Sequence, residues 1–215
     1  MKTIDRYPII LLFSAATLCC ACNKEAEELN LSDDLQFIAT HMEHAECKTL
    51  MGDRTEDGQY PLLWSRGDRI VISSSSSVRA SSCFVTEDER AGSARFVYDQ
   101  SVSENTRPKK AEEWQAFYPA SGYSFADGKH VLSLNSTQEY SESGFGSGAM
   151  PMAASSTTKE LSFKNLCGIC RLRISSLKKD AYVNEIKLKA DKNLYGSLYC
   201  TSASGTWMMG KDGGN

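Results

Sequence analysis

The sequence predicts an all-β fold, a sandwich of antiparallel strands, because short apolar runs alternate with turn signals and helical periodicity is almost absent. The apolar runs cover residues 83–85, 95–98, 114–118 and 131–134. Residues that favour turns separate them, namely Ala91-Gly92, residues 105–108, Ser121-Gly122 and Asp127-Gly128. Strands that each bury one face can share a core by packing sheet against sheet, which gives the sandwich.

The first domain is expected to begin soon after the N-terminal segment. Residues 35–40 (LQFIAT) predict the first strand, and the glycine- and acid-rich residues 51–58 predict an exposed loop after it. Trp64 closes a further strand, Gly67-Asp68 makes a turn, and residues 70–72 open the next strand. Together with the later runs, these strands predict one sandwich domain over residues 35–158.

A polar stretch at residues 155–159 predicts a seam before a second unit, residues 159–215. Within this unit, residues 182–189 alternate between an apolar face that includes Ile186 and Leu188 and a mostly charged face. This is the pattern of a half-buried antiparallel strand. The unit is too short for an independent sandwich, so we expect an incomplete second β domain.

The N-terminal residues predict export and a lipid anchor. Lys2 and Arg6 precede a run of apolar and small residues that ends at Cys22, which predicts a signal peptide over residues 1–21. As a helix, its core of about ten residues would reach roughly 15 Å, too short to span a bilayer. The small residue before Cys22 favours lipidation of that thiol, and an ordinary secretory signal is the alternative. Residues 22–34 would then form a flexible acidic tether.

Composition narrows the possible functions. A net charge of -3 and a pI near 5.7 argue against a basic nucleic-acid interface. Five cysteines follow Cys22, an odd number that does not make a closed disulfide framework, and their disulfide state stays open: Cys47, Cys83, Cys167, Cys170 and Cys200. Cys167 and Cys170 form a CxxC pair, but a strand would turn them to opposite faces, and no second pair follows at zinc spacing. We therefore expect no metal and no cofactor.

Other motifs give little support for binding or catalysis. Residues 66–68 spell RGD, but the same residues are ordinary in a tight turn, so integrin recognition is not expected. His41 and His44 could share a helix face, but no third metal ligand is in view. A hydrolase would need His130 beside an acid and a nucleophile, and no G-x-S-x-G turn is present. We expect no enzyme.

A series of short motifs runs in order along nearly the whole chain. They are the lipoprotein signal at Cys22, Trp64-x-x-Gly67-Asp68-x-Ile70, Tyr118-Pro119, Met150-Pro151-Met152-Ala153, Leu161-x-Phe163-Lys164-Asn165-Leu166-x-Gly168 and Leu194-Tyr195-Gly196. In this order they resemble the fimbrillin-like proteins of the Bacteroidales, the lipoprotein-derived subunits and anchors of type V pili. The resemblance implies two transthyretin-like β-sandwich domains. It also implies lipid anchoring in the outer membrane at the cell surface, and a structural or adhesive role as shaft subunit, anchor or tip of a fimbrium.

The resemblance also implies how the chain would meet its partners. In polymerising members an arginine-specific protease removes the first strand, and a strand of the next subunit fills the vacated groove. Arg54, in the loop after the first expected strand, is the candidate cut here. The outer membrane and other fimbrial subunits are therefore the expected partners, nucleic acid is not, and the adhesive ligand stays open.

Glycan binding by a surface lipoprotein of a nutrient-uptake system is the alternative function. Trp64 and Trp114 could stack on sugar rings if both were exposed, although aromatic residues at strand positions are more often core. Buried indoles would favour a scaffold, and an exposed coplanar pair would favour a sugar site.

Overall fold

The computed structural model describes residues 36–41, 50–51, 56, 61–74, 81–102, 107–108, 112–141, 144–145, 149–170, 172, 174–176, 178 and 180–211. All of them belong to one compact unit, Leu35–Asn215. The predicted signal, Cys22 and the tether lie outside the described residues, and so do His44, Cys47 and Arg54. The described residues form strands and one short 3-10 turn, η1 (Ala120–Gly122), with no α-helix among them. The all-β prediction is confirmed.

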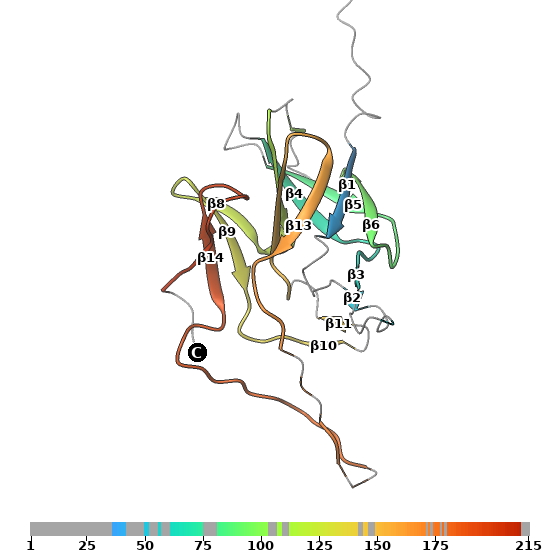
Figure 1. The fold of residues 1–215 in the computed structure, drawn as a ribbon, viewed down its shortest axis with the longest axis vertical. Coiled ribbons are helices and arrows are strands. Elements are labelled where there is room, and N and C mark those ends of the chain that lie inside the picture. Colours follow the sequence, from blue (N-terminus) through green and yellow to red (C-terminus); the bar gives the residue numbers. More distant parts are fainter. Residues whose placement is uncertain are drawn as a thin grey trace, which may run out of the picture. The chain divides into compact units, whose positions relative to one another are not determined.

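Seven strands close into a barrel (Figure 1). In order around it they are β1 (Gln36–His41), β13 (Glu160–Asn165), β12 (Met152–Ser156), β7 (Trp114–Tyr118), β4 (Arg69–Ser74), β5 (Ser81–Thr86) and β6 (Ser93–Tyr98). Neighbouring strands are antiparallel except β1 and β13, which are parallel. The main sheet closes on itself because β1 pairs with both of its outer strands, β13 and β6. Residue alternation could not reveal this, since a barrel and a sandwich both bury one face of each strand.

Two smaller sheets accompany the barrel. The first has the order β15 (Met208–Met209), β14 (Gly196–Cys200), β9 (Lys129–Leu134), β8 (Tyr123–Ala126), and we call it the side sheet. The second has the order β10 (Tyr140–Ser141), β11 (Gly144–Phe145), β2 (Leu50–Met51), β3 (Leu62–Leu63). All pairings within the two sheets are antiparallel.

The barrel core is rich in aromatic side chains supplied by alternate strand positions. On β5, for example, Ser82, Phe84 and Thr86 are buried, while the residues between them are partly exposed. The large side chains that are fully buried inside the barrel include Phe37, Trp64, Phe84, Phe96 and Phe163. Burial of one Phe side chain stabilises a fold by roughly 2 to 3 kcal/mol, so this cluster is a major source of stability.

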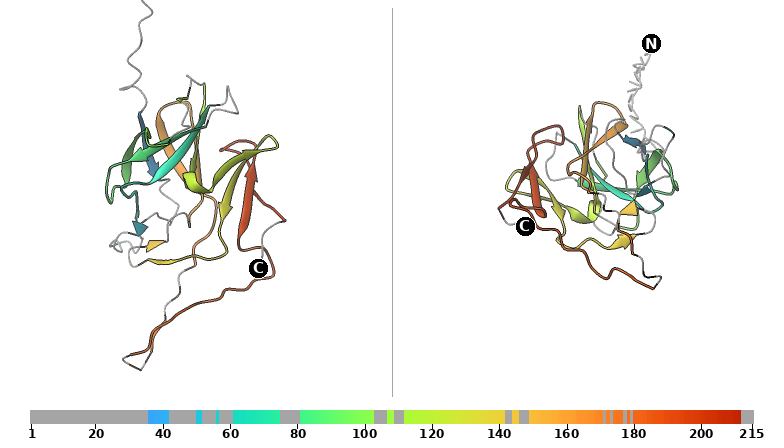
Figure 2. Two further views of the ribbon diagram at one scale, coloured as in Figure 1. Left: turned by 180° about the vertical axis from the view of Figure 1, so that it is seen from behind. Right: turned by 60° about the horizontal axis from the view of Figure 1, so that its bottom comes forward.

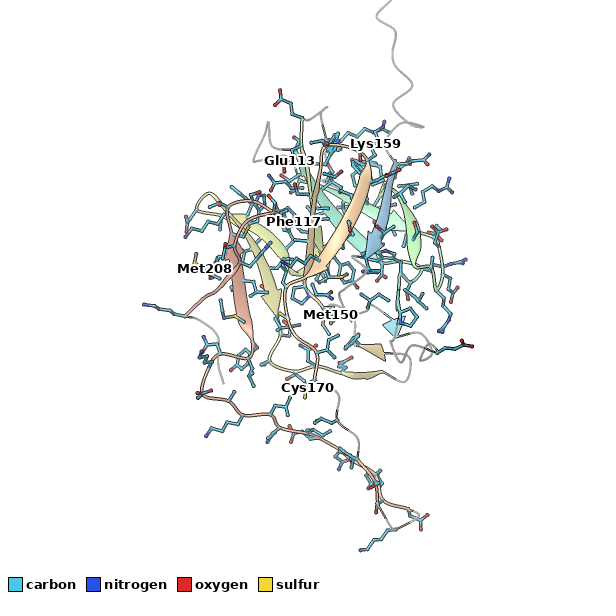
Figure 3. The ribbon with its side chains drawn as sticks, in the orientation of Figure 1. Glu113, Phe117, Met150, Lys159, Cys170 and Met208 are labelled. Carbon is cyan, nitrogen blue, oxygen red and sulfur yellow. The ribbon has the colours of Figure 1, made fainter. Side chains whose placement is uncertain are left out.

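Strand β7 is buried on both faces and joins the barrel to the side sheet. Trp114, Ala116 and Tyr118 belong to the barrel core, whereas Phe117 belongs to a second cluster with Leu132 and Leu198 of the side sheet. The backbone N–H of Ala203 donates a 3.0 Å hydrogen bond to the Oε1 of buried Gln115. Figure 3 shows Phe117 between the barrel and the side sheet. Because both faces of β7 are covered, all five residues of the predicted run at 114–118 are buried, Gln115 included.

The C-terminal segment departs from its predictions. The expected seam at residues 155–159 lies in the hairpin from β12 to β13, and both strands belong to the barrel, so residue 158 does not divide one sheet from another. The strand expected over residues 182–189 is not formed with any described residue, and Tyr182 is 83% exposed. Alternation favours a strand only where a neighbouring strand is present to bond its backbone, and the described part of the chain supplies none here.

Candidate functional site

The first strand occupies a groove between β6 and β13, which we call the β1 seat. Phe37 of β1 faces Phe96 of β6 in an antiparallel register, and Ala39 faces Leu161 of β13 in a parallel register. The N–H of Ile38 donates a 2.9 Å hydrogen bond to the carbonyl of Lys159. A single short strand therefore closes the barrel, and the backbone groups of both neighbours bond to it.

Two side chains of β1 point into the core and anchor the strand. Phe37 is fully buried, with its ring centroid 5.1 Å from that of Phe84 and 5.2 Å from that of Trp114, both in edge-to-face geometry. Ala39 is also fully buried, and its carbonyl accepts a 3.0 Å hydrogen bond from the indole Nε1 of Trp64. Edge-to-face aromatic pairs contribute about 0.5 to 1.5 kcal/mol beyond their buried area. Phe37 is thus the principal anchor of β1.

Trp64 is the centre of this aromatic core. Its ring stacks on His41 at the end of β1, with centroids 4.5 Å apart. It also makes edge-to-face contacts with three rings at 5.0 to 5.5 Å, those of Phe96, Tyr118 and Phe163. Trp64 is 0% exposed and Trp114 is 6% exposed, so neither indole offers a face on which a sugar could stack. The two weak glycan candidates are part of the scaffold.

The RGD tripeptide forms an internally bonded turn. One carboxylate oxygen of Asp68 accepts the N–H of Ser65 at 2.8 Å, and the other accepts the hydroxyl of Tyr118 at 3.0 Å. Burial and the nearby Asp68 charge together raise the pKa of Tyr118, which keeps its hydroxyl a donor. Gly67 has φ +83°, a conformation that glycine adopts without strain. Both carboxylate oxygens of Asp68 therefore accept hydrogen bonds within the fold, and the positive φ of Gly67 agrees with the turn interpretation of residues 66–68.

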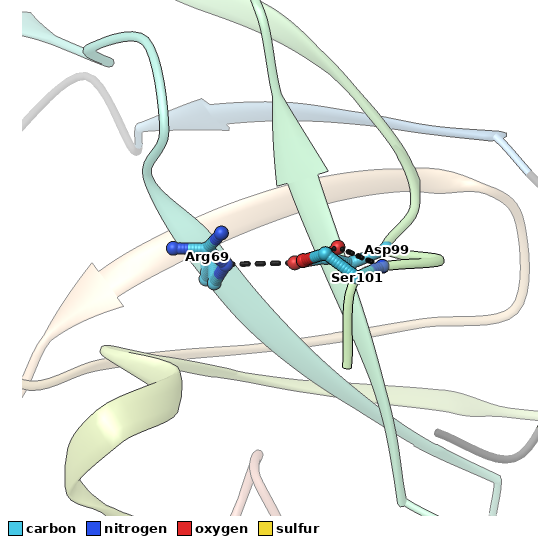
Figure 4. Close-up of polar contacts among 3 residues, drawn as sticks. All are labelled: Arg69, Asp99 and Ser101. Atoms are coloured by element: carbon cyan, nitrogen blue, oxygen red, sulfur yellow. Dashed lines mark hydrogen bonds and ion pairs between the residues drawn. The ribbon is translucent and has the colours of Figure 1, made fainter. Parts of the chain in front are cut away.

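An ion pair between half-exposed Arg69 and buried Asp99 holds the end of β6 to β4 (Figure 4). The Nε of Arg69 is 2.7 Å from the Oδ2 of Asp99, whose side chain is 4% exposed. Burial by itself raises the pKa of Asp99, but hydrogen bonds from Ser101 and Arg69 outweigh it, and the net pKa is lowered. Burial raises the pKa of neighbouring Cys83 to about 11, so its thiol stays protonated at neutral pH. Sequence reasoning missed this pair because its members are thirty positions apart.

The cysteines and histidines do not gather into a recognisable reactive centre in the described residues. Cys167, Cys170 and Cys200 are free thiols; Cys167 is partly buried, and Cys170, labelled in Figure 3, is exposed. The CxxC pair lies after β13 and not within a strand, which differs from the predicted location. Among the residues that the structure describes, no group of three or more possible ligands is arranged to hold a metal ion.

His130 is enclosed by aromatic rings in the side sheet. Its ring stacks on Phe117 with centroids 4.4 Å apart and meets Phe125 edge to face at 5.1 Å. Its Nδ1 is 3.0 Å from the hydroxyl of Tyr123. Burial lowers the pKa of His130 to about 4 and raises that of Tyr123 to about 12. The surroundings stabilise a neutral, packed imidazole.

The buried state of His130 predicts a loss of stability in mild acid. The unfolded chain binds a proton near pH 6.5 and the folded chain only near pH 4, so the free energy of unfolding falls as the pH drops between these values. We expect a loss of about 2 kcal/mol, measured by urea unfolding at a series of pH values. In His130→Asn, the free energy of unfolding should no longer fall between these pH values. Below about pH 4 it should still fall, because protonation of Asp99 contributes to that separate loss of stability. An equal slope in both proteins would contradict the assignment.

Comparison of the chain with protein-family models, curated proteins and solved structures found no match. Within the described part of the chain, no helix is both long and apolar enough to cross a membrane.

Proposed function

We propose that this protein is a fimbrillin-like surface lipoprotein, a structural or adhesive component of a type V fimbrium. The observation that carries the proposal is the β1 seat, in which the first strand closes the barrel between β6 and β13. A strand held by two ladders and one large anchor, Phe37, can be replaced by another strand of similar pattern. The motif order along the chain, from Cys22 to Leu194-Tyr195-Gly196, gives independent support.

The proposal includes the anchor and the finer fold. A diacyl group on Cys22 would hold the mature chain at the outer membrane on the cell surface, because more than one acyl chain is needed for stable membrane binding. The transthyretin-like arrangement is also part of the proposal, supported by the antiparallel pairing of all barrel strands except β1 with β13. It assigns no catalytic step, cofactor or metal to the protein.

Strand replacement leaves the barrel with an open groove unless a second strand arrives. Removal of β1 would leave the backbone groups of β6 and β13 without their partners and would empty the space that Phe37 fills. Unpaired buried backbone groups are costly, so the opened seat would bind an incoming strand strongly. Candidate donors are strands of other fimbrial subunits, whose alternate apolar side chains would occupy the positions of Phe37 and Ala39.

The processing step is tested with an arginine-specific protease on the full chain. We expect one early cut after Arg54, a new N-terminus at Thr55, and subsequent assemblies that persist on a denaturing gel. Arg54→Gln is the control and should remain uncut at this position and unassembled. A protein that is cut elsewhere, or that assembles equally well as Arg54→Gln, would exclude Arg54 as the processing site.

The anchor is tested separately by metabolic labelling with palmitate. We expect label on the wild-type chain and none on Cys22→Ala, with loss of the variant from the outer-membrane fraction. An unlabelled wild-type chain would show that the N-terminal segment is an ordinary secretory signal, and the lipoprotein part of the proposal would then be wrong.

A further inference from the structure

The described residues between β13 and β14 carry exposed apolar side chains and pair with no described strand. Figures 1 and 2 show the chain leaving β13, running away from the sheets and returning to β14. We call its returning part, residues 180–192, the free arm. Tyr182 is 83% exposed, Leu188 55% and Ile186 49%. Apolar side chains gathered on one exposed segment indicate an interaction surface.

The free arm has the residue pattern of a strand but not its hydrogen bonds. Residues 182–190 form no strand, and no backbone hydrogen bond joins them to another described residue. Tyr182, Ile186 and Leu188 alternate with Glu185 and Lys187. Along this apolar face the N–H and C=O groups have no backbone partner among the described residues, and such an edge is the surface that a second strand recognises.

The charges of the free arm are complementary to those of a second copy in reverse direction. If two arms pair antiparallel with Ile186 opposite Ile186, Glu185 lies opposite Lys187 and Asp180 lies opposite Lys192. Symmetry repeats each pair, and Tyr182 then faces Ala190. No like charges face each other directly in this register. Opposite charges across a strand pair stabilise it, and like charges destabilise it.

Neighbouring registers of the two arms are less favourable, because they bring like charges together or set an apolar face against a charged one. A shift that centres the pairing on Glu185 places two carboxylates opposite each other, and one that centres it on Lys187 places two ammonium groups opposite each other. A slip by a single residue sets the apolar face against the charged face. Within one copy, the Nζ of Lys187 is already 3.3 Å from the Oε2 of Glu185, and both side chains are exposed. They can therefore exchange this contact for pairs across the axis.

We propose that the free arms of two copies pair as antiparallel strands about a two-fold axis through Ile186. The strand that pairs with the free arm comes from a second copy of this chain, because the charges of the arm are complementary to those of the same arm in reverse direction. Binding to an unrelated partner would not require this self-complementarity. The pairing satisfies backbone groups of both copies and joins their two apolar faces into one stripe. A two-stranded ribbon is only marginally stable in water, so the dimer is expected to be weak and concentration-dependent. It is separate from the β1 seat, and it goes beyond the proposed function.

The test is charge complementation in the full chain, followed by sedimentation velocity over a concentration series. Glu185→Lys and Lys187→Glu should each weaken self-association at least tenfold, because each sets like charges across the axis. An equal mixture of the two variants should recover the association of the wild-type chain. The substituted side chains are exposed, so circular dichroism should show unchanged folds. A wild-type monomer at every concentration, or single variants that associate like the wild type, would overturn the proposal.

A second measurement locates the axis. Ile186→Cys should form a disulfide-linked dimer under mild oxidation, because the two side chains face each other across the axis. Val183→Cys is the matched control, since its residue faces Lys189 and should crosslink at the background level of the native cysteines. Equal crosslinking of both variants would contradict the register. Neither experiment alters Cys22, Arg54 or β1, so failure here leaves the proposed function standing, and the reverse also holds.

Discussion

Trp64→Ala is expected to lower the free energy of unfolding by about 4 kcal/mol, a large part of the stability of a domain of this size. The side chain is fully buried, it contacts four rings, and its indole N–H bonds to the Ala39 carbonyl. Removal leaves a cavity beside the seat of β1 that the surrounding rings can fill only partly. Urea unfolding followed by circular dichroism measures the change.

Trp64→Phe is the matched control for this experiment. It keeps an aromatic ring in the core but removes the indole N–H that bonds to Ala39, so we expect a smaller loss of about 1 to 2 kcal/mol. If Trp64→Ala cost less than about 1 kcal/mol, the buried indole would not be a main contributor to the stability of the barrel.

Phe117→Ala is expected to lower the free energy of unfolding by about 3 to 4 kcal/mol and to loosen the side sheet more than the barrel. Phe117 is fully buried and stacks on Tyr123, with centroids 4.9 Å apart, and on His130 at 4.4 Å. It projects from β7 on the face away from the barrel core. Its loss therefore removes the main apolar contact between the two sheets and leaves the barrel rings in place.

Hydrogen exchange in Phe117→Ala distinguishes loosening of the side sheet from loosening of the barrel. Amides of β9 and β14 should lose protection before those of β4 and β5, because local opening follows the weakened contact. Phe117→Leu serves as control, since it keeps most of the buried volume and should preserve the order of exchange in the wild-type protein. Uniform loss of protection in all four strands would show that the barrel and the side sheet unfold as one cooperative unit.

Short-range patterns predicted the individual strands well. The expected run at residues 114–118 coincides with β7, the runs at 83–85 and 95–98 lie within β5 and β6, and the first expected strand differs from β1 by one residue at each end. These predictions succeeded because alternation and turn residues act over a few neighbouring positions. The burial of Trp64 and Trp114 could be suspected from their strand positions, although the sequence left a glycan site open.

Contacts between distant residues could not be predicted in the same way. The pairing of β1 with β13 joins residues about 120 positions apart, and no local pattern distinguishes this partner from another strand with a buried face. The ion pair of Arg69 with Asp99 likewise depends on the turn after β6 reaching β4. For residues 182–189 the local pattern predicted a strand, but the described fold provides no neighbour to pair with it.

By itself the sequence determined the β class and the approximate places of the barrel strands, because hydrophobic alternation is a property of neighbouring residues. It also carries the features from which a lipid anchor at Cys22 and a fimbrillin-like function are proposed. Only the tertiary structure decided that seven strands close into a barrel, that β1 completes it, and that Trp64 lies in its core. The physical reason is that closure depends on which backbone groups meet across long stretches of chain, and many pairings satisfy the same local pattern.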